Sequence, residues 1–218
     1  MNLIWIAPPA AGKGTYCSMF KEKYGFNHIS AGDVLREEVS KGSSIGHEIS
    51  EIIAHGEMID DHLMKRLIRQ KLTSLDLTKP FMLDGYPRKL NQAQDYEEIL
   101  MNLGLNVDKV VFINISKETG LKRVLGRLTC PVCKKGYNIL TGMAPKIEGV
   151  CDNCGNTLVN RSDDTEETYG ARYNVFLNET KAVINKYKTE GKLIEVNGEA
   201  SPEEVFKELE KLLGVKNG

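Results

Sequence analysis

Four of the five cysteines lie between residues 130 and 154, in a spacing that suits a metal ion. Cys130 and Cys133 form one Cys-x2-Cys pair, and Cys151 and Cys154 form a second pair after seventeen intervening residues. Two such pairs can complete a tetrahedron of thiolates around zinc, although iron also accepts four thiolates. Four buried or redox-active cysteines are the alternative without metal. With no histidine nearby and no open ligand position, we expect a structural metal site.

Cysteine usage also bears on the compartment. The first residues, Met-Asn-Leu-Ile-Trp, lack the basic stretch of a signal peptide. We therefore expect a cytoplasmic protein, in which disulfides are rare and clustered cysteines more often bind metal. The fifth cysteine, Cys17, falls in a predicted helix, where a single cysteine usually acts as a small buried apolar side chain.

A second candidate site follows the first apolar run, residues 3–6, which reads as a strand buried on both faces. Residues 7–15, Ala-Pro-Pro-Ala-Ala-Gly-Lys-Gly-Thr, come next and lead into a helical stretch over 16–24. A strand, a loop with Gly and Lys, and a helix together form the usual setting for binding phosphate. The free N–H groups of the helix attract anions, Lys13 adds a positive charge, and Gly12 and Gly14 let the backbone approach.

The general phosphate-loop pattern, G-x-x-x-x-G-K-[ST], is not fully met. Position 7 is Ala where the pattern has Gly, and Gly14 separates Lys13 from the hydroxyl of Thr15. An ordinary strand-to-helix turn that happens to carry Gly-Lys-Gly-Thr is therefore the alternative.

The elements that must position these residues alternate along the chain. Further strands are expected at 28–30, 81–84, 109–115 and 192–196, with helices at 16–24, from Val34, 60–74, 91–103, 117–127, about 165–190 and 202–213. This alternation predicts an α/β fold with a five-stranded parallel sheet and helices on both faces. Ligands bind such sheets at the carboxyl ends of the strands, just before Lys13, Asp33, Asp84 and Arg88. Residues 128–164 interrupt the alternation as an insertion.

Composition excludes several classes of protein. A chain of 218 residues with 41% hydrophobic and 27% charged residues is neither disordered nor fibrous. No apolar run approaches the roughly 20 residues of a membrane span. The 29 basic and 30 acidic residues leave a net charge of −1, which argues against a broad nucleic-acid-binding surface.

Several stretches, in order along nearly the whole chain, resemble the adenylate kinase family, in its bacterial form with a long, metal-bearing lid. They are residues 9–15, 30–36, 83–88 with Gln92, 123–127, Gly136 with Tyr137, 161–164 and Arg172. The resemblance implies a P-loop NTPase-like core of residues 1–29, 60–126 and 165–218. It also implies an AMP-binding segment of residues 30–59 and a lid of residues 127–164 with structural Zn²⁺.

The same resemblance implies phosphoryl transfer from Mg-ATP to AMP, giving two ADP, by a monomer without nucleic-acid or membrane partners. Catalytic residues would be Lys13, Asp84, Arg88, Arg127, Arg161 and Arg172. ATP would contact Ala10, Ala11, Gly12, Lys13, Gly14, Thr15, Arg123, Arg127, Gly136, Tyr137 and Ala200. AMP would contact Ala31, Arg36, Glu57, Met58, Ile59, Gly85, Tyr86, Pro87, Arg88, Gln92, Arg161 and Arg172. Asp84, with Asp33, would orient water around Mg²⁺, and the arginine forks suit phosphate oxygens.

Four residues depart from the family pattern, namely Ala7, Ala10, Tyr16 and Ala31. Ala10 stands where Gly is usual, and its methyl group is tolerable only at negative φ. Ala31 replaces a Thr whose hydroxyl would contact AMP, so we expect weaker AMP binding by about 0.5–1.5 kcal/mol and relaxed discrimination among monophosphates. Two alternatives stay open: a kinase for UMP or CMP, and a zinc-ribbon nucleic-acid-binding protein. Gln92 and the long lid disfavour the first, and the neutral charge and phosphate loop disfavour the second.

Overall fold

The computed structural model describes residues 1–54, 59–161 and 163–215. Its main sheet has the strand order β2-β3-β1-β4-β7, and every neighbouring pair is parallel. The strands are β1 (Asn2–Ile6), β2 (Asn27–Ser30), β3 (Phe81–Asp84), β4 (Lys109–Asn114) and β7 (Leu193–Asn197). The predicted five-stranded parallel sheet is therefore confirmed.

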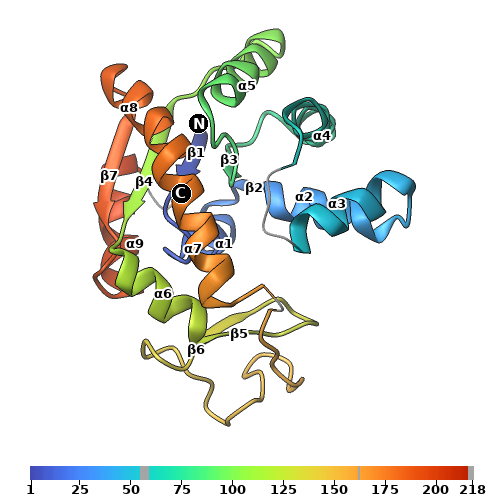
Figure 1. Cartoon of the computed structure of the whole chain (residues 1–218). Coiled ribbons are helices and arrows are strands. Elements are labelled where there is room, and N and C mark those ends of the chain that lie inside the picture. Colours follow the sequence, from blue (N-terminus) through green and yellow to red (C-terminus); the bar gives the residue numbers. More distant parts are fainter. Residues whose placement is uncertain (55–58, 162, 216–218) are drawn as a thin grey trace.

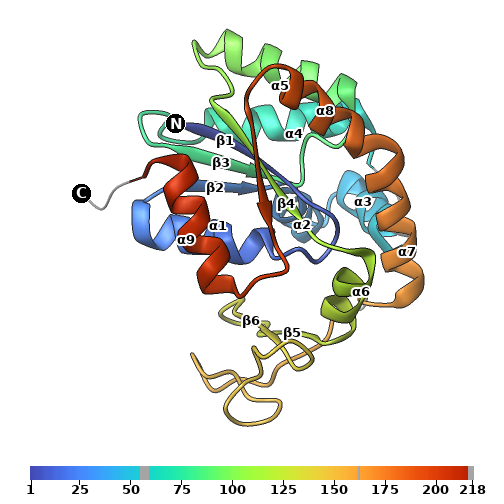
Figure 2. The same ribbon diagram turned by 90° about the vertical axis from the view of Figure 1, so that its left-hand side faces the viewer.

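Strand β1 lies at the centre of the sheet and is buried along its whole length. Its alternate side chains enter two separate apolar clusters, because successive residues of a strand point to opposite faces. Leu3 and Trp5 pack with α1 (Lys13–Tyr24) and α9 (Pro202–Leu213), whereas Ile4 and Ile6 pack with the helices of the other face. Figure 2 shows α1 and α9 on one side of the strands and α4 and α5 on the other.

The second face is covered by helices from the middle and the end of the chain. They are α4 (Asp61–Thr73), α5 (Leu90–Asn102), α7 (Glu166–Val175) and α8 (Lys181–Thr189), with the π-helical turn η1 (Phe176–Thr180) joining the last two. Helix α6 (Lys117–Leu125) follows β4 and leads toward the lid. Local signals explain several helix starts: Asp60, Ser116, Thr165 and Ser201 each cap a helix with a side-chain oxygen.

Two parts project from the sheet (Figure 1). Helices α2 (Ala31–Ser40) and α3 (Ser44–Ala54) form one of them, yet Val34 and Ile49 still belong to the main apolar cluster. The other is the segment predicted to be a lid, whose hairpin of β5 (Arg127–Thr129) and β6 (Gly136–Asn138) has a small cluster of its own around Cys130 and Cys151. The lid therefore has a core separate from both faces of the sheet.

Most predicted elements lie within a few residues of their expected places. Strand 81–84 and helix 202–213 match the structure residue for residue. The first helix begins at Lys13 rather than residue 16, and the second begins at Ala31 rather than Val34 because Ser30 caps it. Helix α3 and the lid hairpin were not predicted. Over the described residues, no helix combines the length and apolar character that crossing a membrane requires.

Candidate active site

The loop between β1 and α1 leaves the amino end of α1 without a side-chain cap. Six other helices (α2, α3, α4, α6, α7 and α9) begin with such a cap, so their first N–H groups are partly satisfied. At α1 the cap position is Gly12 with φ 89°, and Gly14 and Thr15 are exposed. Free N–H groups and the helix dipole at an open amino end favour an anion such as phosphate.

Ala10 does not keep the negative φ that its methyl group led us to expect. Its φ is 64°, in the left-handed region that only glycine enters at no cost. The loop therefore retains a glycine-like path at this position, and alanine bears the strain. Tyr16 packs against Gly12, since a Cβ atom placed on Gly12 would lie 3.3 Å from its ring.

Lys13 and Asp84 bring opposite charges together at the carboxyl ends of β1 and β3. The Lys13 Nζ atom lies 3.8 Å from Asp84 Oδ1, and His28 Nε2 lies 3.8 Å from Asp84 Oδ2. Burial disfavours the charged form of Asp84, but Lys13, His28 and Arg88 outweigh it and hold the Asp84 pKa below its ordinary value. Asp84 is thus a carboxylate at neutral pH, suited to accept hydrogen bonds from water held by a divalent cation.

The segment after β3 positions Arg88 and Gln92. Gly85 has φ 81°, and its carbonyl accepts a hydrogen bond from Arg88 Nε at 2.9 Å. The peptide bond between Tyr86 and Pro87 is cis. The Arg88 backbone N–H donates to Gln92 Oε1 at 2.8 Å, while Gln92 Nε2 donates to Asp61 Oδ1 at 2.6 Å. Gln92 is buried with both polar ends held, so its orientation is set by the protein.

Three of the expected phosphate-binding arginines are paired with aspartates. Arg172 donates to Asp163 at 2.5 Å, and Arg36 donates to Asp33 at 2.5 Å. The third, Arg127, donates two hydrogen bonds to the Asp164 carboxylate, from Nε to Oδ2 at 2.7 Å and from Nη2 to Oδ1. The Asp164 side chain is only 2% exposed, so this pair also ties the start of the lid to its end.

The arginines are close enough to affect one another. Their side chains reach solvent, but surrounding protein removes part of their water. Desolvation, followed by the charges of Arg127 and Arg36, lowers the pKa of Arg161. Desolvation and the charge of Arg172 lower the pKa of Arg88, against the opposing effect of Asp84. Cations that repel one another are stabilised when phosphates lie between them.

The far end of the candidate ATP site lies between α6 and the loop after β7. Arg123 donates to the Gly198 carbonyl at 2.8 Å, which places it beside the loop that carries Ala200. Its own carbonyl accepts from Asn138 Nδ2 at 2.7 Å, a bond between the core and the lid. Glu57 and Met58 lie outside the described residues, and Ile59 is buried in the main cluster.

The lid brings its four cysteines together as the spacing predicted. All four sulfur atoms lie within 4.8 Å of one another, with Cys130 to Cys154 at 3.4 Å and Cys133 to Cys151 at 3.5 Å. A tetrahedral zinc site with bonds of about 2.3 Å separates its sulfurs by about 3.8 Å. The donor set and its geometry therefore fit a four-thiolate ion, and all five cysteines are free of disulfides.

The two cysteine turns are near copies of each other. The N–H of Cys130 donates to Lys135 O, and the N–H of Cys151 donates to Asn156 O, each at 2.9 Å. The residue four after each of these cysteines is left-handed, with φ 63° at Lys134 and 72° at Gly155. Such paired turns aim backbone N–H groups at the sulfurs, which favours thiolates, but burial outweighs this effect at Cys130 and raises its pKa to about 11.

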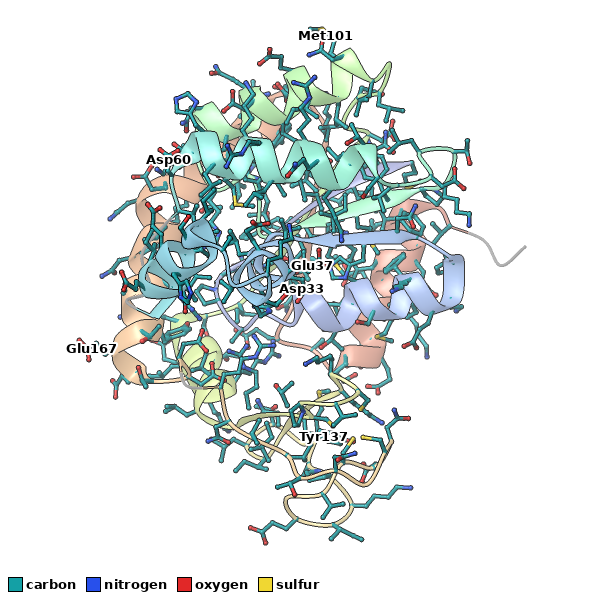
Figure 3. The ribbon with its side chains drawn as sticks, turned by 90° about the vertical axis from the view of Figure 1, so that its right-hand side faces the viewer. Asp33, Glu37, Asp60, Met101, Tyr137 and Glu167 are labelled. Atoms are coloured by element: carbon teal, nitrogen blue, oxygen red, sulfur yellow. The ribbon has the colours of Figure 1, made fainter. Side chains whose placement is uncertain are left out.

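Tyr137 belongs to this metal-binding core. Its ring is buried, and its hydroxyl contacts Cys151 Sγ at 3.4 Å and accepts from the Asp152 N–H at 2.7 Å. Burial raises the Cys151 pKa, but hydrogen bonds from Tyr137 and from backbone N–H groups outweigh it and bring that pKa to about 6. Figure 3 shows Tyr137 within the lid, close to sulfur atoms. Its predicted contact with ATP, like that of exposed Gly136, stays a prediction.

No acidic partner of Gln92, Arg127 or Arg172 was predicted from the sequence. Asp61 holds Gln92, and Asp163 and Asp164 hold Arg172 and Arg127. Pairs of Asp in a loop give no signal of which arginine they face, because that depends on how distant segments pack.

Two surface hollows, of about 470 and 380 Å³, lie beside the α7–α8 region and between α2 and α4, and neither includes a phosphate-loop residue.

Comparison with known proteins identifies the family. The family model described as adenylate kinase matches residues 5–192. A protein named adenylate kinase from Fervidobacterium nodosum is 42% identical over 98% of each chain. Another of that name from Kosmotoga olearia is 42% identical over 97% of this chain and all of its own length, and one from Archaeoglobus fulgidus is 39% identical over 98% of this chain. A phosphate loop, an array of arginines and a match of this extent agree: the chain belongs to the adenylate kinase family.

Proposed function

We propose that this enzyme transfers the terminal phosphoryl group of Mg-ATP to AMP and releases two ADP. The observation that carries the proposal is the convergence of positive charge on the uncapped end of α1. Lys13 lies at that end. The charge of Arg172 lowers the pKa of Arg88. The charges of Arg127 and Arg36 likewise lower the pKa of Arg161. Phosphoryl transfer needs mainly positioning and charge stabilisation, which such an array supplies.

In this proposal the phosphate loop and Lys13 hold the outer phosphates of ATP. Arg36 and Arg88 hold the AMP phosphate, with Gln92 against its base. Arg127 and Arg172 would exchange their aspartate partners for oxygens of the transferring group, and Arg161 would bind the same group. Asp84 would orient water bound to Mg²⁺, which would enter with ATP and neutralise phosphate charge. Arg123 and Ala200 would flank the adenine of ATP.

We further propose that residues 127–164 move as a lid, and that zinc makes them rigid. Two features support this: the lid has its own core around the cysteines, and its links to α6 run through few groups, such as Asn138 to Arg123. Closure would exclude water, which competes with AMP for the phosphoryl group. The 30–59 segment would move less freely, since Val34 and Ile49 pack into the main cluster.

The proposal includes a monomer that works in the cytoplasm on ATP, AMP and ADP. Five free cysteines suit a reducing compartment, and a net charge of −1 disfavours a nucleic-acid partner. Size-exclusion chromatography with light scattering tests the monomer.

A coupled assay of ADP formed from Mg-ATP with AMP, CMP, UMP or GMP tests the reaction. We expect AMP to be the preferred acceptor, and equal rates with CMP would overturn the assignment to adenylate. Arg88→Ala should lower kcat/KM by at least about 100-fold, as expected for a group that binds transferring phosphate. Arg69→Ala, on the exposed face of α4, is the matched control and should retain full activity.

A further inference from the structure

Three side chains beside the phosphate loop form a cluster that the phosphoryl-transfer reaction does not use as a unit. Cys17 comes from α1, His28 from β2 and Asp84 from β3. Their sulfur, imidazole nitrogen and carboxylate oxygen lie within 4.8 Å of one another. Cys17 is fully buried, and the side chains of His28 and Asp84 are only 16% and 14% exposed.

His28 points an unused polar atom into this cluster. Its Nε2 atom is buried and has no hydrogen-bond partner, and its distance of 3.8 Å to Asp84 Oδ2 is too long for a hydrogen bond. A buried nitrogen without a partner costs free energy that a ligand would recover. The other oxygen, Oδ1, faces Lys13, so Oδ2 is the oxygen directed at His28.

The distances approach those of a metal centre. A nitrogen and an oxygen at about 2.0–2.2 Å from a tetrahedral ion lie about 3.3–3.5 Å apart, so the His28–Asp84 distance of 3.8 Å would have to close by about 0.3–0.5 Å. The widest separation in the cluster, up to 4.8 Å, would have to close by about 1 Å. Thiolate, imidazole and carboxylate together suit zinc or cobalt and do not suit magnesium, which prefers oxygen alone.

We propose that Cys17, His28 and Asp84 form a second metal site, separate from the lid, that binds Zn²⁺ or Co²⁺ with water as the fourth ligand. On binding, the Cys17 thiol loses its proton to solvent and donates a sulfur lone pair, and no atom is oxidised or reduced. Neutral His28 donates through Nε2, and Asp84 through Oδ2.

This second site would bind metal more weakly than the four cysteines of the lid and would therefore be occupied after them. It offers one thiolate where the lid offers four, and Lys13, 3.8 Å from Asp84, repels a cation. Both features weaken binding of the second ion relative to the first.

Occupancy would inhibit the kinase, a consequence that rests on the proposed function. An ion held by Asp84 Oδ2 removes the carboxylate from the water around Mg²⁺ and adds positive charge beside Lys13. The second site would therefore act as an inhibitory sensor of free transition metal, acting through a residue of the active site.

Metal analysis of the full-length protein tests the site without reference to activity. Protein with zinc in the lid is dialysed against buffered Co²⁺, and bound zinc and cobalt are counted. We expect two metals per chain and a thiolate-to-cobalt charge-transfer band. Cys17→Ala and His28→Gln should each keep one metal and weaken binding of the second by at least about 100-fold. His62→Gln, an exposed histidine on α4, is the control and should keep two.

Kinase assays in Zn²⁺ buffers test the consequence. Wild-type protein should lose activity as the second site fills, and Cys17→Ala should keep it. One metal per chain in the wild type, or two in Cys17→Ala, would overturn the site. Two metals without inhibition of an active enzyme would overturn the sensor. Two metals in a chain inactive with AMP would leave the site standing and refute the proposed function instead.

Discussion

Ala10→Gly should stabilise the protein, although removing a methyl group normally destabilises it. At φ 64°, alanine bears a left-handed backbone, which costs an L-residue roughly 1–2 kcal/mol. Glycine removes that cost but loses about 0.5–1 kcal/mol more chain entropy on folding. The difference is a gain of about 0.5–1 kcal/mol in the free energy of unfolding. For a chain of this size that corresponds to a rise in Tm of about 1–4 °C.

Ala11→Gly is the matched control, one residue along the same loop. Ala11 is 1% exposed and does not have positive φ, so glycine there loses a buried methyl group and chain entropy together. It should lower the free energy of unfolding by about 1–2 kcal/mol. Urea unfolding followed by circular dichroism measures both variants without nucleotide. If Ala10→Gly destabilises the protein as much as Ala11→Gly does, alanine is not strained at position 10 and the reasoning fails.

Three further predictions concern the lid and the AMP site. Serine at both Cys130 and Cys154 should remove the metal ion from the lid and lower Tm, since a structural zinc ion can contribute on the order of 10 kcal/mol; unchanged metal content and Tm would contradict it. Ala31→Thr should lower the KM for AMP by about 2- to 10-fold while the KM for ATP stays the same; an unaltered KM for AMP would show that the hydroxyl finds no partner. Asp61 has a pKa held below 3.8, against burial, by Asn91, Gln92 and Lys89, so its stabilising effect is present above that value and lost as pH falls through the lower folded pKa. Asp61→Asn should therefore be less stable than wild type at neutral pH and match it in acid, and a difference constant with pH would rule this out.

The sheet and most helices were predictable because their signals are local. Strand 81–84 is an apolar run, and helix 202–213 carries a capping box between Ser201 and Glu204 with Pro202 at its first position. Helix α3 was missed although Ser43 caps its start, where the Ser43 hydroxyl oxygen accepts a hydrogen bond from the Gly46 N–H at 3.0 Å. The lid hairpin was missed because it depends on the cysteine cluster, which only the folded chain assembles.

The candidate site also contains residues that local spacing identifies and residues that only packing brings together. Cys130 to Cys154 and Lys13 could be identified from spacing alone, because a turn or loop of fixed length determines where their side chains meet. The left-handed backbone at Ala10 could not, since the residue type argues against it. Nor could Asp61 be assigned to Gln92, because α4 and α5 come together only through packing on the sheet.

The paired aspartates explain how a site for polyanions exists in a chain with a net charge of −1. Arg36, Arg88, Arg127 and Arg172 would repel one another and lose water if they converged without partners. Each has a carboxylate close enough to counter that cost, in Asp33, Asp84, Asp164 and Asp163 respectively. In the proposed reaction, nucleotide phosphates would replace these carboxylates as the partners of the arginines. Nucleotide affinity should therefore depend less on ionic strength than the number of arginines suggests. Each new ion pair between arginine and phosphate replaces an existing ion pair between arginine and aspartate, so the net change in electrostatic interaction is small.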